Sequence, residues 1–239
     1  MFFSCLDKQY IAIIGDIKNS RKIDNRKEVQ TKLNGVLDEI NQTYCEEIAA
    51  GFLITLGDEF QGLLLNGKSV MKMIQKIEKS MYPIELRYGI GIGTITTDIN
   101  AEMALGADGP AFYKARNAID CLKANENKKC TALSDIRIES EDGSFHQNLL
   151  LNTIFELLKS VKDQWTDRQR EIIWDMLEHQ NGQNHAAERL GISQPTVQKG
   201  LAKGNYYIYK NAVENIEKVL GEIYKCCLLY TSDAADDLT

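Results

Sequence analysis

Three acidic residues from two separate segments offer the clearest chemistry in this sequence. Asp16 follows the apolar run YIAIIG, whereas Asp58 and Glu59 lie between the apolar runs 52–56 and 60–65. Carboxylates are the hard oxygen ligands that Mg²⁺ and Mn²⁺ prefer, and these ions complete their coordination with water and substrate phosphates. If the fold joins the two segments, the acids form a metal site suited to phosphoryl or nucleotidyl transfer.

The elements that must position these acids follow from the spacing of apolar residues. Short isoleucine-rich or alternating runs predict strands, and apolar residues three and four apart predict helices. The predicted strands are 10–15, 52–56, 60–65, 84–97 and 131–138, and the predicted helices of this part are 26–44, 70–77 and 110–124. The order βαββαβ, followed by αβ, begins with a ferredoxin-like unit.

The ferredoxin-like unit would bring the acids together. Its first and second strands are parallel, with the third strand between them and antiparallel to both. The end of the first strand therefore lies beside the turn between the second and third strands. Neighbouring strands are about 5 Å apart, so Asp16 and Asp58 are expected to share a cation. The alternative is that Asp58 is a hairpin-turn residue and Asp16 a strand terminator.

Glycine occupies every second position in the predicted strand 84–97, at Gly89, Gly91 and Gly93. Alternate residues of a strand point to the same face, and glycine leaves that face without side chains. A helix or a ligand is therefore expected to approach this backbone closely.

Basic residues near the acids are candidate partners for a phosphate. Lys18, Arg21 and Lys22 follow the first acid, and Lys114 and Arg116 lie on the predicted helix 110–124. Arginine holds a phosphate through two parallel hydrogen bonds and lysine acts as a point charge. The alternative is that each is a solvated surface charge.

Four segments together carry a resemblance to known families. The stretches YIAIIGDIKNSRKI, TLGDEFQGLL, RYGIGIG and GADGPAFYKARNAI look like the palm-type catalytic domain of class III nucleotidyl cyclases and GGDEF diguanylate cyclases. Taken with the C-terminal segment, they resemble more closely the bacterial SatD-like family. The resemblance implies an α+β, ferredoxin-like palm that binds a nucleotide with Mg²⁺ or Mn²⁺.

The same resemblance implies roles for individual residues. Asp16 and Asp58 match the metal-binding pair of the cyclases, with the backbone carbonyl of Ile17 as a further ligand, and Arg116 joins the two acids as a catalytic candidate. Two departures bear on cyclisation: Tyr113 stands near the position of a ribose-binding Asn, and Arg116 falls one residue short of the cyclase Arg. A further departure is Leu56 in place of the first glycine of GGDEF.

The C-terminal part predicts an all-α domain that begins near residue 148. A leucine-rich helix there is apolar around much of its girth, which indicates burial against another domain or a second chain. We therefore expect a homodimer. The polar stretch 139–147 is interpreted as the linker, with a palm domain at 1–138 and the helical domain at 148–226.

Residues 183–204 have the pattern of a helix-turn-helix. Ala187 supplies a small residue at the helix crossing, Gly191 suits a left-handed turn, and Val197 packs the second helix on the first. The stretch AAERLGISQPTVQKGL is similar to sigma-factor region four and to many bacterial repressors. The exposed positions of the second helix can read DNA in a major groove, at Gln194, Thr196, Gln198 and Lys199.

The charge balance limits how this motif meets DNA. Residues 165–225 hold eight basic and eight acidic side chains, and the whole chain of 239 residues has a net charge of -6. Bulk attraction to nucleic acid requires a basic surface, so any DNA contact must be local. The alternative is that the motif docks another protein or packs within the dimer.

Three sequence features lead us to expect a cytoplasmic protein. The start MFFSCLDKQY lacks the pattern of a signal peptide, no run reaches the roughly 20 apolar residues of a membrane span, and the six cysteines show no CxxC spacing. The tail 227–239, which begins CLLYTSDAADD, resembles the translation of a sequencing adapter. It is interpreted as an artefact and excluded from the fold argument.

The motifs together predict a cytoplasmic DNA-binding regulator whose palm binds a nucleotide or phosphate ligand through a divalent cation. The alternative is an active nucleotidyl cyclase or related phosphoryl-transfer enzyme, with a helical domain that dimerises it. In a third hypothesis the acids are only turn residues of a binding scaffold.

Overall fold

A computed structural model describes residues 8–126, 134–141 and 145–232. Five strands form one sheet: β1 (Tyr10–Ile17), β2 (Ile48–Leu56), β3 (Glu59–Leu64), β4 (Leu86–Gly93) and β5 (Ile136–Ser140). Eight α-helices accompany them in the described chain: α1 (Arg26–Thr43), α2 (Val70–Met81), α3 (Pro110–Glu126), α4 (Phe145–Asp163), α5 (Asp167–His179), α6 (Gln183–Leu190), α7 (Gln194–Lys203) and α8 (Tyr206–Ser232). A short 3₁₀ turn, η1 (Ser20–Lys22), follows β1.

The sheet has the order β2-β3-β1-β4-β5. Strand β1 is antiparallel to both β3 and β4, and β2 is antiparallel to β3. This is the order of a ferredoxin-like unit, so the α+β fold predicted for this part of the chain is confirmed. Strand β5 extends the unit by pairing parallel to β4.

The observed strand boundaries differ from the prediction. Strand β1 continues to Ile17 rather than ending at residue 15, and β2 begins at Ile48 rather than at residue 52. Strand β4 stops at Gly93 rather than continuing to residue 97, because the backbone N–H of Thr94 donates to the Glu141 carboxylate instead of a neighbouring strand (2.9 Å). Strand β5 begins at Ile136, and residues 131–133 of the predicted strand lie outside the described chain.

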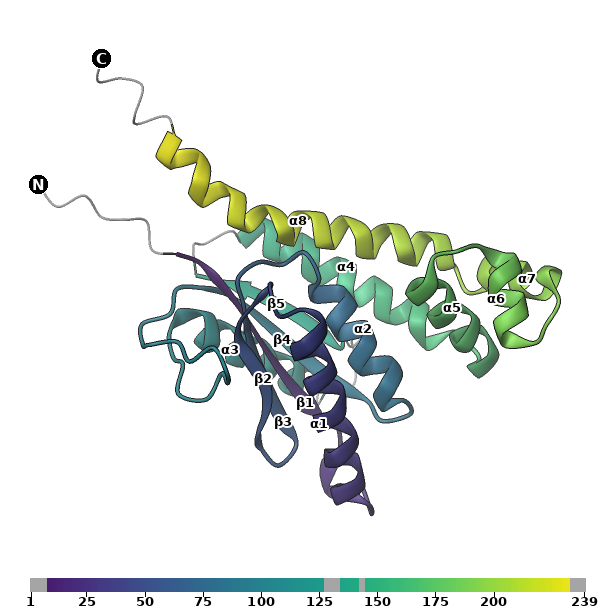
Figure 1. Ribbon diagram of the computed structural model, residues 1–239, viewed down its shortest axis with the longest axis horizontal. Helices are drawn as coiled ribbons and strands as arrows, with labels where there is room; N and C mark the ends of the chain where they lie inside the picture. Colours follow the sequence, from purple (N-terminus) through teal and green to yellow (C-terminus); the bar gives the residue numbers. More distant parts are fainter. Residues whose placement is uncertain (1–7, 127–133, 142–144, 233–239) are drawn as a thin grey trace, which may run out of the picture.

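The two faces of the sheet are covered by different helices. Odd positions of β1, such as Ile11 and Ile13, pack in a cluster with residues of α1 and α2. Even positions, such as Ala12 and Ile14, pack in a second cluster with residues of α3. Figure 1 shows α1 and α2 together on one side of the sheet. The alternation follows from the two-residue period of a strand.

The glycine face of β4 is occupied by α3. A Cβ atom on Gly91 would lie 2.0 Å from the backbone oxygen of Ala111, and one on Gly89 would lie 2.2 Å from that of Ala115. Only glycine allows so close an approach of helix to strand. Of the two expected occupants of this bare face, a helix or a ligand, the structure shows the helix.

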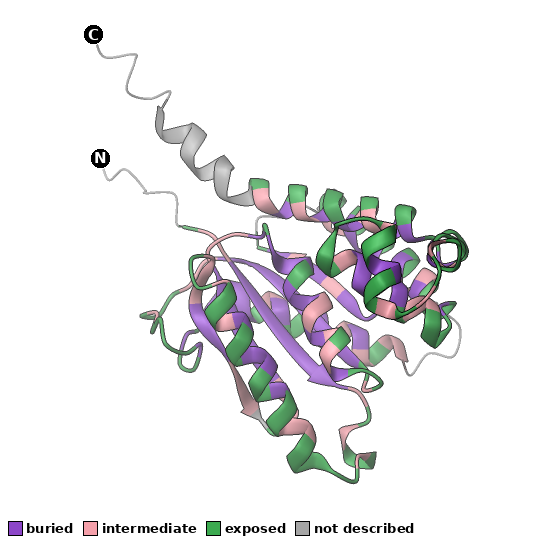
Figure 2. Ribbon diagram, turned by 45° about the vertical axis from the view of Figure 1, so that its right-hand side comes forward, coloured by how far each residue is buried: buried purple, intermediate pink, exposed green. Residues whose placement is uncertain are grey.

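The C-terminal helices pack on the side of α1 and α2. One hydrophobic cluster of buried residues runs from Ile11 in β1 through Phe155 in α4 to Leu220 in α8. Figure 2 shows buried positions continuing from the sheet into these helices. The residues interpreted as a linker, 139–147, include the end of β5 and the start of α4. The division into two domains stays a prediction.

Helix α8 continues to Ser232, so its backbone includes the first six residues of the segment interpreted as an artefact. Among the described residues, no helix is long and apolar enough to cross a membrane.

Candidate functional site

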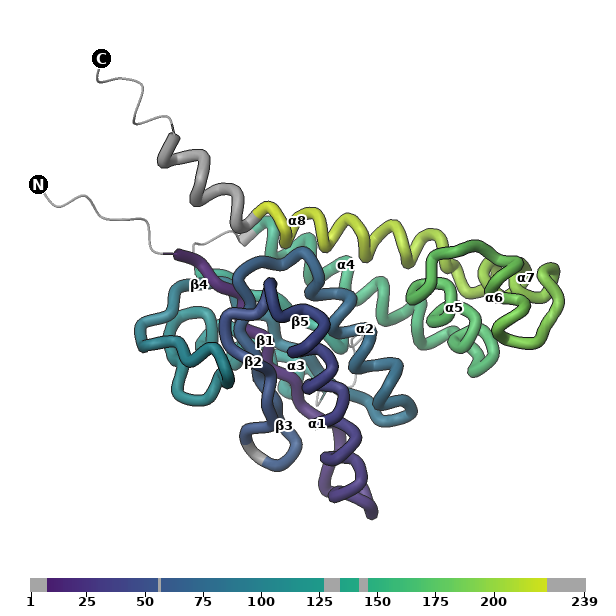
Figure 3. The backbone as a smooth tube through the Cα atoms, in the orientation of Figure 1, coloured from purple at the N-terminus to yellow at the C-terminus, as the bar shows by residue number. Residues whose placement is uncertain are grey.

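A row of three charged residues crosses the α3 face of the sheet. Asp16 at the end of β1 pairs with Glu59 on β3 and with Arg87 on β4. Directly opposed residues in antiparallel strands have Cβ atoms about 4.5–5.5 Å apart and point to the same face. The backbone N–H of Ile17 donates to the carbonyl oxygen of Asp58 (3.1 Å). The sheet therefore brings both acidic segments to the same end, where β1 stops beside the β2–β3 turn. Figure 3 shows the β2–β3 hairpin at the lower end of the sheet.

Asp16 already has two cationic partners, one in this row and one on α3. Its side chain is buried, with Oδ2 at 2.5 Å from Nη1 of Arg87 and Oδ1 at 3.4 Å from Nζ of Lys123. Lys123 comes from the last turn of α3. Both carboxylate oxygens thus face a positive charge supplied by the protein itself.

As these side chains lie, they do not fit a divalent ion. Oxygen donors of suitable chemistry are present in Asp16, Asp58 and Glu59, but both oxygens of Asp16 are engaged by Arg87 and Lys123. Within the described residues, no group of three or more His, Cys, Asp or Glu side chains is placed to hold a metal ion. We therefore derive no catalytic step through a metal at this row.

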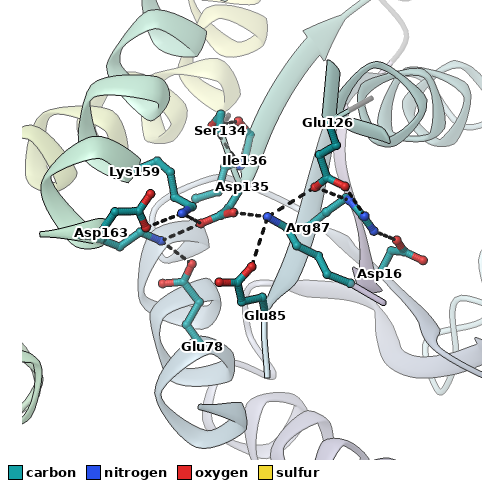
Figure 4. Close-up of polar contacts among 12 residues, drawn as sticks. Asp16, Glu78, Glu85, Arg87, Glu126, Ser134, Asp135, Ile136, Lys159 and Asp163 are labelled. Carbon is teal, nitrogen blue, oxygen red and sulfur yellow. Dashed lines mark hydrogen bonds and ion pairs between the residues drawn. The ribbon is translucent and has the colours of Figure 1, made fainter. Parts of the chain in front are cut away.

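The row continues into a larger set of ion pairs, most of them buried or half-buried, which we call the charged network (Figure 4). The Nε and Nη2 groups of Arg87 also donate hydrogen bonds to the Glu126 carboxylate. The Nζ atom of Lys18 lies 2.7 Å from Oδ1 of Asp135 and 3.4 Å from Oε1 of Glu126. Asp135 also forms ion pairs with Lys159 and Lys162 of α4. The network comprises Asp16, Lys18, Glu78, Glu85, Arg87, Glu126, Asp135, Lys159 and Lys162.

The network raises the pKa of two of its lysines, Lys18 and Lys162. Burial lowers the pKa of Lys18, but the three acids Asp135, Glu126 and Glu85 together raise it by more. The net pKa therefore lies above the ordinary value. Lys162 behaves likewise: burial lowers its pKa, but Glu78, Tyr209 and Asp135 together outweigh that effect, so its net pKa is raised. Lys18 is therefore charged and already paired with three acids, Asp135, Glu126 and Glu85, rather than free to hold a phosphate.

The other predicted phosphate partners, Arg21, Lys22, Lys114 and Arg116, form no ion pair with Asp16 among the described residues. Arg21 is exposed on η1. On α3, Lys114 is half-buried and Arg116 is exposed. Arg116 precedes Lys123 by two turns, about 10 Å along the helix axis. The structure therefore brings together Asp16, Glu59 and the Asp58 turn, but not Arg116.

Sequence reasoning missed Arg87, Lys123 and Glu126, although one signal could have found the first. Arg87 is in phase with Gly89 and Gly91, so strand periodicity places it on the same face, beneath α3. A charge at such a position needs a buried partner.

A second candidate region lies at the far end of the molecule, where α6 and α7 follow α5 (Figure 1). Gly191 ends α6 in the left-handed conformation, with φ +62°. Val197 and Leu201 bury one side of α7. A Cβ atom on Gly200 would lie 2.8 Å from Cδ1 of Ile172, and Gly204 contacts Ile173 similarly. These glycines lower helix propensity, but they let α7 lie close to α5.

The opposite side of α7 is polar. Thr196, Gln198 and Lys199 are exposed. Gln194 is half-buried, and its Nε2 donates to the side chain of Gln183 on α6 (2.7 Å). Of the four residues expected to face DNA, three are therefore open to solvent and one helps to join α6 to α7.

The fold and the two regions define a class: an α+β protein with a ferredoxin-like sheet, a charged network beside it and a C-terminal helical segment. The chain belongs to the SatD family, whose family model matches residues 10–220.

Solved structures give only distant similarity. A guanylyl cyclase domain of the RhoGC fusion protein from the aquatic fungus Blastocladiella emersonii is 16% identical over 46% of this chain and 74% of that chain, with a TM-score of 0.36. A bacterial light-regulated adenylyl cyclase is 14% identical over 54% and 74%, with a TM-score of 0.38. A regulator of polyketide synthase expression from Bifidobacterium adolescentis is 12% identical over 91% and 81%, with a TM-score of 0.28. These scores are too low to carry an argument, and no curated protein matches the chain.

Proposed function

We propose that the protein is a DNA-binding regulator that places α7 in a major groove. The observation that carries the proposal is the two-sided character of α7. Its buried residues Val197 and Leu201 fix the helix on its neighbours, while Thr196, Gln198 and Lys199 remain exposed. A helix held in this way by a preceding helix and a short turn is the arrangement of DNA-reading helix-turn-helix motifs.

The exposed side chains have defined roles in this proposal. Glutamine can make paired hydrogen bonds to an adenine edge, and lysine can contact guanine or a phosphate. Because basic and acidic residues are balanced in 165–225, few phosphates would be neutralised. Binding is then expected to show a shallow dependence on salt.

Selection of DNA from a random pool by the full chain, followed by fluorescence anisotropy, tests the proposal. Gln198→Ala should weaken binding to the selected sequence by about 10- to 100-fold, because a specific base contact contributes about 1–3 kcal/mol. Lys199→Ala should also weaken binding, whereas its matched control Lys218→Ala, which removes an exposed charge from α8, should not. No enrichment, or equal binding by Gln198→Ala, would exclude the proposal.

We also propose that the regulator is a homodimer. Helix α4 exposes Leu149, Leu150 and Leu157, at 54%, 65% and 63%. A second copy would remove this apolar surface from water, and twofold symmetry would present two α7 helices to two half-sites. Sedimentation equilibrium should show a dimer that Leu150→Glu converts to a monomer. A monomeric wild-type chain would contradict this arrangement.

A second candidate function is metal-dependent binding or turnover of a nucleotide by the sheet domain, with Mg²⁺ or Mn²⁺. The observation that favours it is the opposition of Asp16 and Glu59 beside the Asp58 turn. The pairing of Asp16 with Arg87 and Lys123 counts against this second function.

Calorimetric titration with ATP and GTP, with and without Mn²⁺, tests the second function. Binding that needs Mn²⁺ and disappears in Asp16→Asn and Asp58→Asn would support it. Product formation lost in Asp58→Asn would identify a cyclase or related phosphoryl-transfer enzyme.

A further inference from the structure

A cavity of about 450 Å³ lies between α2 of the sheet layer and α5 of the helical segment. This volume falls within the range of small-molecule sites, which often form where two structural layers meet. The end of α1 and Tyr44 complete its wall. The cavity is separate from the charged row at Asp16, none of whose residues lines it.

One wall of this cavity is a row of lysines. Lys72, Lys76 and Lys79 recur at spacings of four and three on α2, so they share one helix face, and all three line the cavity. Lys76 pairs with Glu39 at 2.7 Å, and Lys79 pairs with Glu178. Both acids are more than half exposed, so each pair contributes only about 0–1 kcal/mol. A multiply charged anion could therefore displace these acids from the lysines.

An aromatic side chain stands on the opposite wall. Trp174 of α5 is half-buried and lines the cavity. Its ring meets Tyr82 edge to face, with centroids 5.3 Å apart, and the guanidinium of Arg170 lies 5.5 Å from its centroid. These contacts fix the ring in place. Aromatic rings held in this way are platforms on which nucleobases stack.

We propose that this cavity binds a nucleoside phosphate, with the base against Trp174 and the phosphates along Lys72, Lys76 and Lys79. A base needs an aromatic surface, and phosphates need closely spaced cations. The cavity offers both on facing helices. No divalent ion and no contribution from Asp16 or Asp58 is required, which separates this site from the metal-dependent alternative.

The ligand would touch the helix that supports α7. Helix α5 lines the cavity through Trp174, and its residues Ile172 and Ile173 pack on Gly200 and Gly204. Occupancy of the cavity would thus act on the position of α7. This consequence for DNA rests on the proposed function, whereas binding itself does not.

Binding is tested without DNA, so that its failure is distinct from failure of the proposed function. ATP, GTP and inorganic phosphate are titrated into the full chain in EDTA, by calorimetry and by tryptophan fluorescence. Trp165 is buried and donates to the Gly204 carbonyl, so a fluorescence change is expected to come from Trp174. We expect at least one nucleotide to bind more tightly than phosphate alone.

Variants then locate the site. Lys76→Ala and Lys79→Ala should each weaken nucleotide binding at least fivefold, whereas Lys218→Ala, which removes an equal charge from α8, should not. Trp174→Leu should reduce the preference for nucleotide over inorganic phosphate, and circular dichroism checks that each variant is folded. Absence of binding at millimolar nucleotide, or unchanged affinity in both lysine variants, would overturn the proposal. So would binding that needs Mn²⁺ and is lost in Asp16→Asn.

Discussion

Arg87 determines what Asp16 can do. An aspartate at the end of a central strand suggests a ligand for a metal ion. Here the guanidinium of Arg87 and the ammonium of Lys123 lie against this carboxylate in place of a metal ion. Burying an ion pair costs desolvation that its attraction barely offsets, whereas removing one partner leaves an uncompensated buried charge. The sequence could predict that Asp16 lies near Asp58 and Glu59. It could not predict the pairing with Arg87, which depends on the register between β1 and β4.

Replacing Arg87 should therefore be costly. Arg87→Met leaves Asp16 without its nearest cation and Glu126 without its forked partner, and we expect a loss of about 3–5 kcal/mol in the free energy of unfolding. The double variant Arg87→Met with Asp16→Asn should recover part of this loss, because it no longer buries an unpaired aspartate. Urea denaturation measures both. Equal stability of Arg87→Met and wild type would show that the pairing is not formed in solution.

The pH dependence of stability provides a second test at this scale. Burial raises the pKa of Glu126, but Arg87 and Lys18 lower it more, so the net pKa lies below 4.5. A carboxyl group with a lowered folded-state pKa stabilises the protein fully above its unfolded-state pKa, and this contribution is lost as pH falls through the folded-state pKa. Wild type should therefore lose more stability than Glu126→Gln below about pH 4.5. Urea midpoints at pH 5, 4 and 3 measure this, and parallel losses in both proteins would contradict it.

Among the elements, the close contact between α3 and β4 is the one that the sequence best predicts. Alternating glycines at 89, 91 and 93 indicated a bare face, but periodicity alone left open whether a helix or a ligand covers it. Glycine also has a low helix propensity, so Gly200 and Gly204 by themselves disfavour a helix near the end of α7, but propensity does not include tertiary contacts. In the structure both glycines are contact points that bring α7 close to Ile172 and Ile173.

Two glycine-to-alanine substitutions should have opposite effects. A methyl group at Gly91 would collide with the backbone of Ala111 and Ala115, which cannot rotate away, so Gly91→Ala should destabilise the protein by about 3 kcal/mol or more. Gly35 lies inside α1 with open space around it. Gly35→Ala should stabilise by up to about 1 kcal/mol through helix propensity. Thermal unfolding compares the two, and a stable Gly91→Ala variant would mean that α3 does not pack as described.

At the scale of the whole molecule, the question is whether the sheet and the C-terminal helices form separate domains. Changes in composition and motif suggested two domains with a linker at 139–147. The structure instead joins the sheet layer and the helices through one hydrophobic cluster and through ion pairs such as Lys162 with Glu78 (2.6 Å). A pattern along the chain shows which face of a helix is apolar, but not which distant element covers it. The long-range contacts of α8 were therefore beyond prediction.

The shared cluster predicts that the described chain unfolds as one cooperative unit. Domains with separate cores unfold independently, whereas a continuous core couples them. Both tryptophans lie in the helical segment, so their fluorescence reports on that segment and far-ultraviolet circular dichroism reports on the whole chain. The two urea midpoints should coincide. They should also shift together in Gly91→Ala, although that change lies in the sheet. If Gly91→Ala moved only the circular dichroism transition, the helical segment would be a domain that folds on its own.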